Sequence, residues 1–304
     1  MFPIVPANSA AVSGNQEGVF GFGQDGSTKL THTNLVSNTG VVASDVAATG
    51  AARDGLAACE YGGDKGIFGF GRDAGGNTAS TCLVTNAGVV GNDVAGVGTA
   101  RFLLAACSYG EDKGIFGYGH ETYSITNKVG NDGVVASDTA GVGTDRYAPA
   151  ACEYGEDKGI FGYGADAGAG YIVVAMTNLV SNTGVVTADQ AAITGTARNY
   201  LAAIGYGGDK GMFGFGYSTS PCAITNLVSN AGVVASDQAA TTGTGKFVLA
   251  ATQYGGDKGI FGFGMDVPDS FVGETNLVSN TGVVADDVAA VGTARAYIAA
   301  CSFN

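Results

Sequence analysis

Apolar residues in this chain come in short runs, and polar clusters rich in glycine separate one run from the next. Within a run such as KGIFGFG the pattern alternates as it does along a strand, and glycine interrupts every window in which a helical period of 3.6 residues could begin. The separating clusters, Gly-Gly-Asp-Lys-Gly and Ser-Asn-Thr-Gly among them, tolerate positive φ and are typical of hairpins. The pattern therefore predicts an all-β chain of short antiparallel strands.

One phrase, YGGDKGIFGFG at residues 61 to 71, recurs along the chain. Near copies start at Tyr109, Tyr154, Tyr206 and Tyr254. The lysine of the phrase returns at intervals of 48, 45, 52 and 48 residues, and a looser copy, QEGVFGFG, ends at Gly23. Such a period is typical of a propeller or solenoid built from one supersecondary unit. Each unit contains breaks for four short strands, with Asp64 and Lys65 at the tip of a hairpin.

The two ends of the chain complement each other. The last segment, TARAYIAACSFN, reads as a first strand without a second, whereas EGVFGFG near the start reads as a second strand without a first. Their pairing would complete a sixth unit and remove exposed sheet edges. We expect a single domain over residues 1–304: a six-bladed β-propeller of four-stranded antiparallel blades, in which the N- and C-terminal strands share one blade. Residues 1–13 are expected either to add an edge strand or to pack on one face.

The repeated phrase also predicts how the blades pack. Strand alternation places Phe68 and Phe70 on one face and Gly69 on the other. The rings of one blade would then rest on the glycine backbone of the next blade.

Each unit carries an Asp after its Val-Val pair, and an Arg or Lys follows eight or nine residues later. The simplest interpretation is a structural ion pair, Asp45 with Arg53 and its equivalents, between the fourth strand of one blade and the first strand of the next. A ring of carboxylates for Ca²⁺ is the alternative, but one Asp per blade supplies too few oxygen ligands for one ion. The repeated acids are Asp45, Asp93, Asp138, Asp189, Asp237 and Asp287.

Four of the six cysteines hold one repeated position, the end of the phrase AAC, which Ile204 and Thr252 occupy in other units. A position that accepts Cys, Ile and Thr is typical of a small, half-buried strand residue, so these four are expected to be free thiols. They are Cys59, Cys107, Cys152 and Cys301. Cys82 and Cys222 fall outside this register, and their pairing stays open.

Composition excludes several functional classes. The net charge is -13 and no run of Lys or Arg exists, so nucleic acid is not an expected partner. No apolar span of about 18 residues predicts membrane insertion, and the start lacks the basic region and apolar core of a signal peptide. The two histidines, His32 and His120, lie in variable segments. We therefore expect no enzyme, no catalytic residues, no metal and no cofactor.

The segment after each FGFG or FGYG strand varies from unit to unit. Because these segments connect equivalent strands, we expect them to gather on one face, where loops are free to bind a ligand. The aromatic candidates are Tyr123, Tyr171, Tyr217 and Phe271, and the polar candidates are Asp25, Asp73, Asp166 and Asp266. The alternative is that these differences are tolerated and carry no function.

Five units open with an arginine and the sixth with Lys246. The GIFGFG strand stands in the place of a glycine-terminated strand, and TNLVSNTG stands in the place of a third strand with its turn. In these features, over nearly its whole length, the chain resembles kelch-type propellers, whose repeat is about 50 residues long. It departs from them because it has no Trp, and Val-Val pairs such as Val41 with Val42 stand where that family has one.

The phrases TNLVSNTGVVA, TGTAR and YGGDKGIFGFG are also similar to repeats in structural proteins of phages from aquatic samples. This resemblance implies a non-enzymatic virion component, appended to the tail or capsid, with a face for host glycans or proteins. Its expected partners are other proteins of the same particle, further copies of itself, and glycans. The alternative is a cellular, cytoplasmic propeller that is lectin-like or mediates protein interactions.

Overall fold

The computed structural model describes residues 16–120, 123–190, 195–239, 243–267 and 269–303, and the regular elements of these ranges are β-strands. The all-β prediction is thus confirmed. The prediction for residues 1–13 concerns a segment outside the described residues. No helix in the described ranges is both long and apolar enough to cross a membrane.

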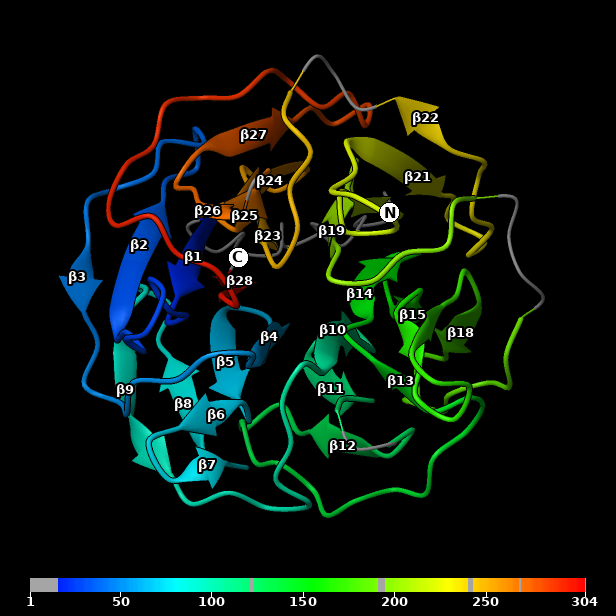
Figure 1. Ribbon diagram of the computed structural model, residues 1–304. Helices are drawn as coiled ribbons and strands as arrows, with labels where there is room; N and C mark the ends of the chain where they lie inside the picture. Colours follow the sequence, from blue (N-terminus) through cyan, green and yellow to red (C-terminus); the bar gives the residue numbers. More distant parts are fainter. Residues whose placement is uncertain (1–15, 121–122, 191–194, 240–242, 268, 304) are drawn as a thin grey trace, which may run out of the picture.

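Antiparallel pairing arranges the described strands in six principal sheets, numbered here in chain order (Figure 1). Sheet 1 contains β28 (Ala299–Phe303), β1 (Glu17–Gly21), β2 (His32–Val36) and β3 (Val46–Ala47). Sheet 2 contains β4 (Ala57–Tyr61), β5 (Lys65–Gly69), β8 (Thr81–Val84) and β9 (Val90–Val94). Sheet 3 contains β10 (Ala105–Tyr109), β11 (Lys113–Gly117) and β12 (Thr126–Val129).

The remaining principal sheets follow the same order from the inside outward. Sheet 4 contains β14 (Ala150–Tyr154), β15 (Lys158–Gly162) and β18 (Thr177–Val180). Sheet 5 contains β19 (Ala202–Tyr206), β20 (Lys210–Gly214), β21 (Ile224–Val228) and β22 (Gln238–Ala239). Sheet 6 contains β23 (Ala250–Tyr254), β24 (Lys258–Gly262) and β27 (Thr275–Val278).

Short hairpins form in the variable segments. Strands β6 (Arg72–Asp73) and β7 (Gly76–Asn77) pair with each other, as do β25 (Met265–Asp266) and β26 (Ser270–Phe271). Strand β16 (Ala165–Asp166) pairs with both β13 (Arg146–Tyr147) and β17 (Ile172–Val173).

The prediction of four strands in every sheet is wrong for sheets 3, 4 and 6, in which the described residues form three. In these sheets the fourth segment pairs only through isolated bridges, such as Thr126 with Thr139. The segment contains Gly and Asp, which are poor strand formers, and even in sheets 1 and 5 it forms a strand of only two residues. The predicted joining of the chain ends is confirmed, because β28 pairs with β1 from Glu17–Phe303 to Gly21–Ala299.

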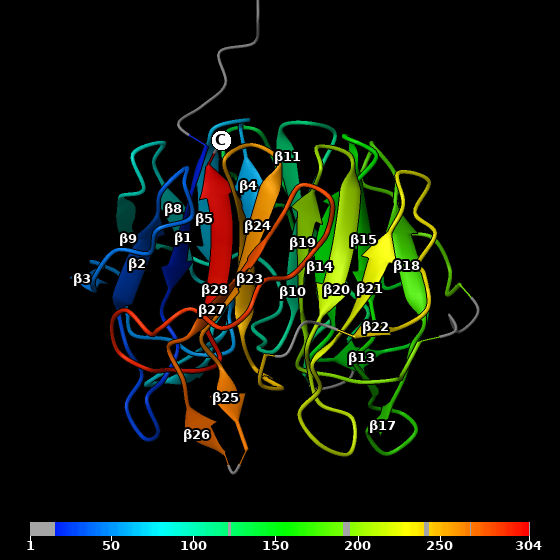
Figure 2. The ribbon, with the colours of Figure 1, turned by 90° about the horizontal axis from the view of Figure 1, so that it is seen from above.

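The innermost strands of the six sheets surround a central axis (Figure 1). Each of them contacts the innermost strand of the next sheet, and β28 closes the circuit by contacting both β23 and β4. In Figure 2 the inner strands run side by side along this axis.

Backbone hydrogen bonds also form a closed circuit, which we call the axial ring. Its six members each precede an innermost strand: Gly55, Leu103, Ala148, Tyr200, Val248 and Tyr297. Each donates its N–H to the carbonyl of the preceding member, over distances from 2.7 to 3.1 Å, and Gly55 donates to Tyr297. All six have positive φ, from 49° to 62°. For the five that are not glycine this conformation costs on the order of 1 kcal/mol each, which the closed circuit and its surroundings must offset.

Aromatic rings fill the junctions between neighbouring sheets. Phe116 of sheet 3 lies over Gly69 of sheet 2, so close that a Cβ at Gly69 would be 2.8 Å from its ring. Phe70 contacts the same ring edge-on, with 5.2 Å between centroids. An equivalent pair occupies each of the other junctions: Phe22–Phe68, Tyr118–Phe161, Tyr163–Phe213, Phe215–Phe261 and Phe263–Phe20.

The predicted placement of Phe68 and Phe70 on one face is wrong, although the stacking of rings on glycine is confirmed. Phe68 packs toward sheet 1 with Phe22, whereas Phe70 packs toward sheet 3 with Phe116. Strand β5 ends at Gly69, and Phe70 has a φ of 62°. This left-handed residue ends the alternation, so each junction receives one ring from either side.

A network of polar side chains connects the segment before each inner strand to the outer part of the same sheet. In sheet 1, buried Arg295 donates to Oδ1 of Asn34 over 2.7 Å, and Asn34 donates to Oδ1 of Asp45 over 2.9 Å. Asp45 also accepts the backbone N–H of Thr293 over 2.8 Å. The same base, amide and acid recur as Arg101–Asn127–Asp138, Arg146–Asn178–Asp189, Arg198–Asn226–Asp237 and Lys246–Asn276–Asp287.

The predicted pairing of Asp45 with Arg53 is wrong. Arg53 pairs with Asp93 of its own sheet, at 3.2 Å, and Asp45 lies 3.6 Å from Arg295. The reason is that the chain passes from sheet 1 to sheet 2 between Asp45 and Arg53. The buried side chain of Arg53 then extends outward within sheet 2. Cys82 takes the place of the asparagine in sheet 2, where it accepts from Arg53 and donates to Asp93.

All six cysteines lie in the described ranges and are free. The four of the AAC phrase are buried, not half-buried as predicted, because they face the junctions between sheets. Burial raises the pKa of the Cys59 thiol to about 12, so this thiol stays protonated. The structure thus leaves Cys82 and Cys222 unpaired.

Replacement of Gly69 by Val should destabilise the fold. The branched side chain would collide with the ring of Phe116, and such overpacking costs about 1 to 3 kcal/mol. Urea denaturation should show this loss in the free energy of unfolding. Gly91→Val is the control, since a Cβ there meets only a carbonyl oxygen at 3.4 Å. Equal stability of the Gly69→Val variant and the wild type would contradict the packing described above.

Acid should destabilise the protein through the repeated acids. Burial alone would raise the pKa of Asp45, but the hydrogen bonds from Thr293 and Asn34 and the charge of Arg295 outweigh it and lower this pKa. A carboxyl whose pKa is lower in the folded than in the unfolded protein stabilises the fold at pH values above its unfolded pKa, near 3.9. This stabilisation is lost as the pH falls through the pKa of the folded state. The pKa values of Asp138, Asp189, Asp237 and Asp287 are lowered in the same way.

We expect the free energy of unfolding to decrease steeply below a pH of about 4, with a smaller decrease for Asp45→Asn. Urea titrations at a series of pH values measure both slopes. Identical slopes for the variant and the wild type would mean that Asp45 does not contribute.

Candidate ligand-binding site

The variable segments lie at one end of the axis. In Figure 2, β17, β25 and β26 project from one end, and the hairpin turns between the inner two strands of sheets 2 to 6 lie at the opposite end. Residues from three of these segments, Arg72, His120 and Tyr171, line a common hollow. The segments thus gather on one face, as the sequence predicted.

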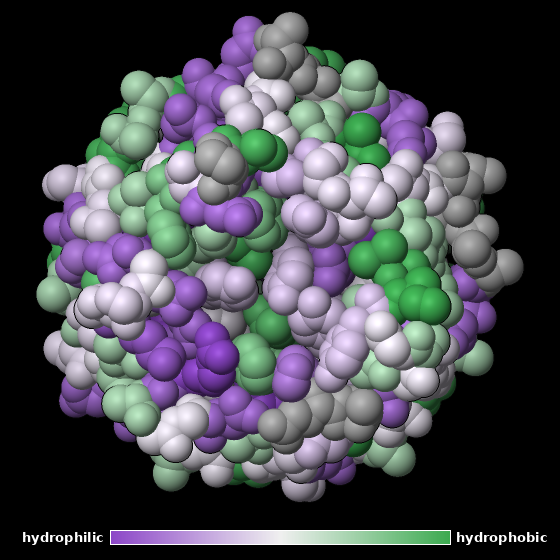
Figure 3. Space-filling view, viewed as in Figure 1, coloured by the Kyte–Doolittle hydropathy of each residue, from purple (hydrophilic) through white to green (hydrophobic). Residues whose placement is uncertain are grey.

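The hollow has a volume of about 450 Å³. Its lining is mostly aromatic and consists of Arg72, Phe102, Leu103, His120, Tyr147, Tyr171, Tyr200 and Tyr297. Figure 3 shows this face, with strongly hydrophilic side chains over β5 and β6 beside the centre. An apolar lining with a few polar groups is typical of a small-ligand site.

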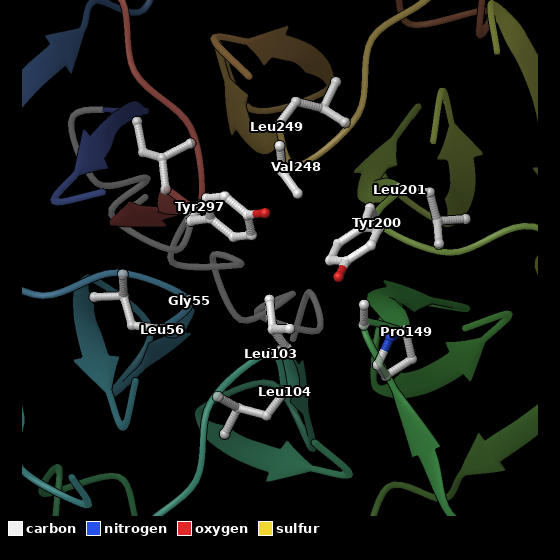
Figure 4. Close-up of a pocket in the computed structure, with 12 residues that line it drawn as sticks. Gly55, Leu56, Leu103, Leu104, Pro149, Tyr200, Leu201, Val248, Leu249 and Tyr297 are labelled. Atoms are coloured by element: carbon white, nitrogen blue, oxygen red, sulfur yellow. The ribbon is translucent and has the colours of Figure 1, made fainter. Parts of the chain in front are cut away.

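The axial ring positions the centre of the hollow. Tyr200 and Tyr297 belong to that ring, and their left-handed backbone directs both side chains over the axis (Figure 4). Their ring centroids lie 6.2 Å apart with nearly perpendicular planes. Leu103 reaches the same point from sheet 3 (Figure 4). The leucines that follow ring members in the sequence point away from the axis and pack in the junctions between sheets: Leu56, Leu104, Leu201 and Leu249.

A chain of hydrogen bonds leads into the hollow. Asn199 Nδ2 donates to the hydroxyl of Tyr147 over 3.1 Å, and Tyr147 donates to the hydroxyl of Tyr200 over 3.0 Å. The Tyr200 hydroxyl thus lies at the end of a hydrogen-bonded chain on the lining of the hollow. Burial raises the pKa of Tyr200 far above its usual value, so its hydroxyl stays protonated.

Other rings form the wall on the side of sheets 3 and 4. Tyr171 packs edge-on against Tyr147, with centroids 5.3 Å apart. The His120 ring lies 4.7 Å from that of Phe102 and stacks over Tyr171 at 6.3 Å. Aromatic faces in such a wall can stack against the apolar face of a ligand.

An ion-pair cluster adjoins this wall on the side of sheet 2. Asp54 is fully buried and accepts two hydrogen bonds from Arg72, at 3.2 Å to Nε and 2.7 Å to Nη2. Lys29 lies 4.0 Å from the same carboxylate. The guanidinium of Arg72 also lies over the ring of Phe102, at 4.4 Å. The hydrogen bond to Asp54 raises the pKa of Arg72, so this side chain stays charged.

Of the candidates named from the sequence, only Tyr171 lines the hollow. Tyr217 and Phe271 pack nearby, in a cluster with Phe247 and Tyr297. Asp73 and Asp166 accept backbone N–H groups of their own turns, from Gly75 and Ala169, so they stabilise the hairpins. Tyr123, Asp25 and Asp266 are not among the lining residues.

Among the lining residues that were not predicted from the sequence are Arg72, Phe102, Tyr147, Tyr200 and Tyr297. Four of them occupy the first or second position after the repeated arginine. These two positions vary among the units while the flanking residues repeat: the axial-ring position holds Gly, Leu, Ala, Tyr, Val and Tyr in chain order. An alignment of the six repeats shows this variation, and the variation is the sequence feature that marks these lining residues.

The opposite end of the axis has a different lining. Gln253 donates to Oε1 of Glu153 over 2.6 Å, and Ser302 donates to Oε2 of Glu60 over 2.8 Å. Gly205 leaves room for the first contact, because a Cβ there would lie 2.1 Å from Nε2 of Gln253. No group of three His, Cys, Asp or Glu within the described ranges could hold a metal ion.

No protein-family model and no curated protein matches this sequence. The interpretation of the site therefore depends on its geometry.

Removal of the Arg72 charge should leave Asp54 buried with only the distant Lys29 beside it. We expect Arg72→Gln to lower the free energy of unfolding by about 1 to 3 kcal/mol, since Arg72 is itself partly exposed. The double variant Asp54→Asn, Arg72→Gln should recover most of this loss, and urea denaturation measures both. If the double variant is as unstable as the sum of the two single changes, Asp54 and Arg72 are not coupled.

Proposed function

We propose that this protein is a six-bladed β-propeller that recognises a ligand in its axial hollow and catalyses no reaction. The proposal of a propeller is supported by the closed circuit of inner strands and by the sheet that joins the two chain ends. The kelch-type resemblance of the sequence agrees with it. Three-stranded sheets in this scheme are blades whose outermost strand is reduced to a bridge.

The observation that carries the proposal is a break in the repeat. Along the junctions and the polar networks, the six units use nearly the same residues. At the axial ring the residues differ from unit to unit. The two tyrosines of the ring lie over the axis, on the face that carries the variable hairpins. A scaffold alone has no need of this difference, whereas a binding site does.

The proposed ligand is a glycan. Sugars have an apolar ring face that stacks on aromatic side chains, and their hydroxyls accept hydrogen bonds from groups such as Tyr200 and Arg72. We further propose, from the resemblance to phage repeats, that the protein is a virion component that binds glycans of the host surface. A cellular lectin-like propeller in the cytoplasm is the second candidate, with the same site.

A glycan array with the purified protein tests recognition. We expect specific binding that a chelator does not remove, because the proposed contacts need no ion. Tyr297→Ala and Tyr200→Ala should abolish binding, whereas Val134→Ala on the exposed rim should not change it. An array on which the wild type binds no glycan would overturn the proposal.

Fractionation tests the proposed location. Antibody detection of the protein in purified particles would support a virion component. Its absence from particles and its presence in the cytosol of the cells would favour the second candidate.

A further inference from the structure

The chain has 14 lysines and arginines, all within the described ranges, and most of them serve the repeat. Six are the fully buried bases of the polar networks: Arg53, Arg101, Arg146, Arg198, Lys246 and Arg295. Five pair with the preceding aspartate in a hairpin turn: Lys65, Lys113, Lys158, Lys210 and Lys258. Lys128 donates to the carbonyl of Thr183 at the turn of the next sheet.

The two remaining cations, Lys29 and Arg72, lie together. Both approach the single buried carboxylate of Asp54, one from sheet 1 and one from sheet 2. At this carboxylate two positive charges meet one negative charge, so the immediate surroundings of Asp54 carry an excess of one positive charge. The chain as a whole has a net charge of -13, so this local excess of positive charge would favour the binding of a negative group of a ligand here.

The geometry leaves donors for such a group. The bonds from Arg72 to Asp54 use Nε and Nη2, so the N–H groups of Nη1 remain for a ligand. Arg72 lines the hollow together with Tyr200, whose hydroxyl is hydrogen-bonded to that of Tyr147. Asp54 fixes the guanidinium in place, which lowers the entropy lost when a ligand binds.

We propose that the axial hollow selects acidic saccharides, whose carboxylate or sulfate group binds Arg72 beside Lys29 while the sugar ring stacks on the tyrosines. This inference rests on the proposed function. A positively charged ligand is disfavoured in this aromatic site, because Arg72 already occupies the face of Phe102 that would otherwise attract a cation. A neutral sugar would gain the stacking but would leave the excess positive charge without a partner.

The test compares matched glycans. The array should carry oligosaccharides with uronic acids, sialic acids or sulfate esters, each beside its carboxyl-reduced or desulfated counterpart. We expect the acidic member of a pair to bind at least roughly tenfold more tightly than its neutral counterpart, with a preference that declines as salt is added. Separate carboxylate and sulfate pairs identify which of the two groups is preferred.

Variants identify the group responsible. Lys29→Gln should reduce the preference for the acidic member of a pair, and Arg72→Gln should abolish it. Since Arg72→Gln leaves Asp54 without its main partner, Asp54→Asn with Arg72→Gln provides a variant without this buried charge. Lys128→Gln removes the same charge at the rim and is the control, expected to bind like the wild type.

The outcomes separate the two proposals. Equal binding of acidic and neutral members would overturn the inference and leave glycan recognition intact. Absence of all glycan binding would overturn both. A preference for acidic glycans that persists in the double variant and in Lys29→Gln would place the anion site elsewhere and overturn the role assigned to Arg72.

Discussion

The axial ring is the constraint on which the remaining structure depends. A closed circuit of six backbone hydrogen bonds exists only if every sheet contributes one member at one height along the axis. Its last bond joins Gly55 to Tyr297, residues from opposite ends of the chain, so closure requires the terminal strands to share sheet 1. The left-handed backbone of the ring is strained wherever the residue is not glycine. Packing at the junctions must offset that strain.

Those junctions account for the composition of the protein. Each one places a ring from one sheet on a strand glycine of its neighbour, close enough to leave no room for a Cβ. Glycine is therefore abundant because sheets meet at their backbones. The buried bases are satisfied by amide and carbonyl oxygens, and Arg53, Lys246 and Arg295 also lie close to aspartates of their own sheets. The networks also connect distant parts of the sequence, as the link from Arg295 through Asn34 to Asp45 illustrates.

A nearly symmetric scaffold of this kind confines variation to a few places. The hydrogen bonds of the axial ring use only backbone atoms, so its side chains are free to differ. Two tyrosines there, with Arg72 held by Asp54, line a hollow that no single repeat contains. Rigid backbone beneath an aromatic lining gives the preorganisation that favours selective binding.

The sequence by itself determined the all-β class, the number of repeats and the joining of the chain ends, because these follow from local alternation, turn residues and a fixed period. It also indicated that rings stack on glycine. Only the tertiary structure decided the direction of Phe70, since a left-handed residue after the strand interrupts the alternation. It also decided that Asp45 pairs with Arg295 and not with Arg53, and that Tyr200 and Tyr297 meet over the axis. These contacts join residues that are far apart in the chain, and no spacing within one repeat encodes them.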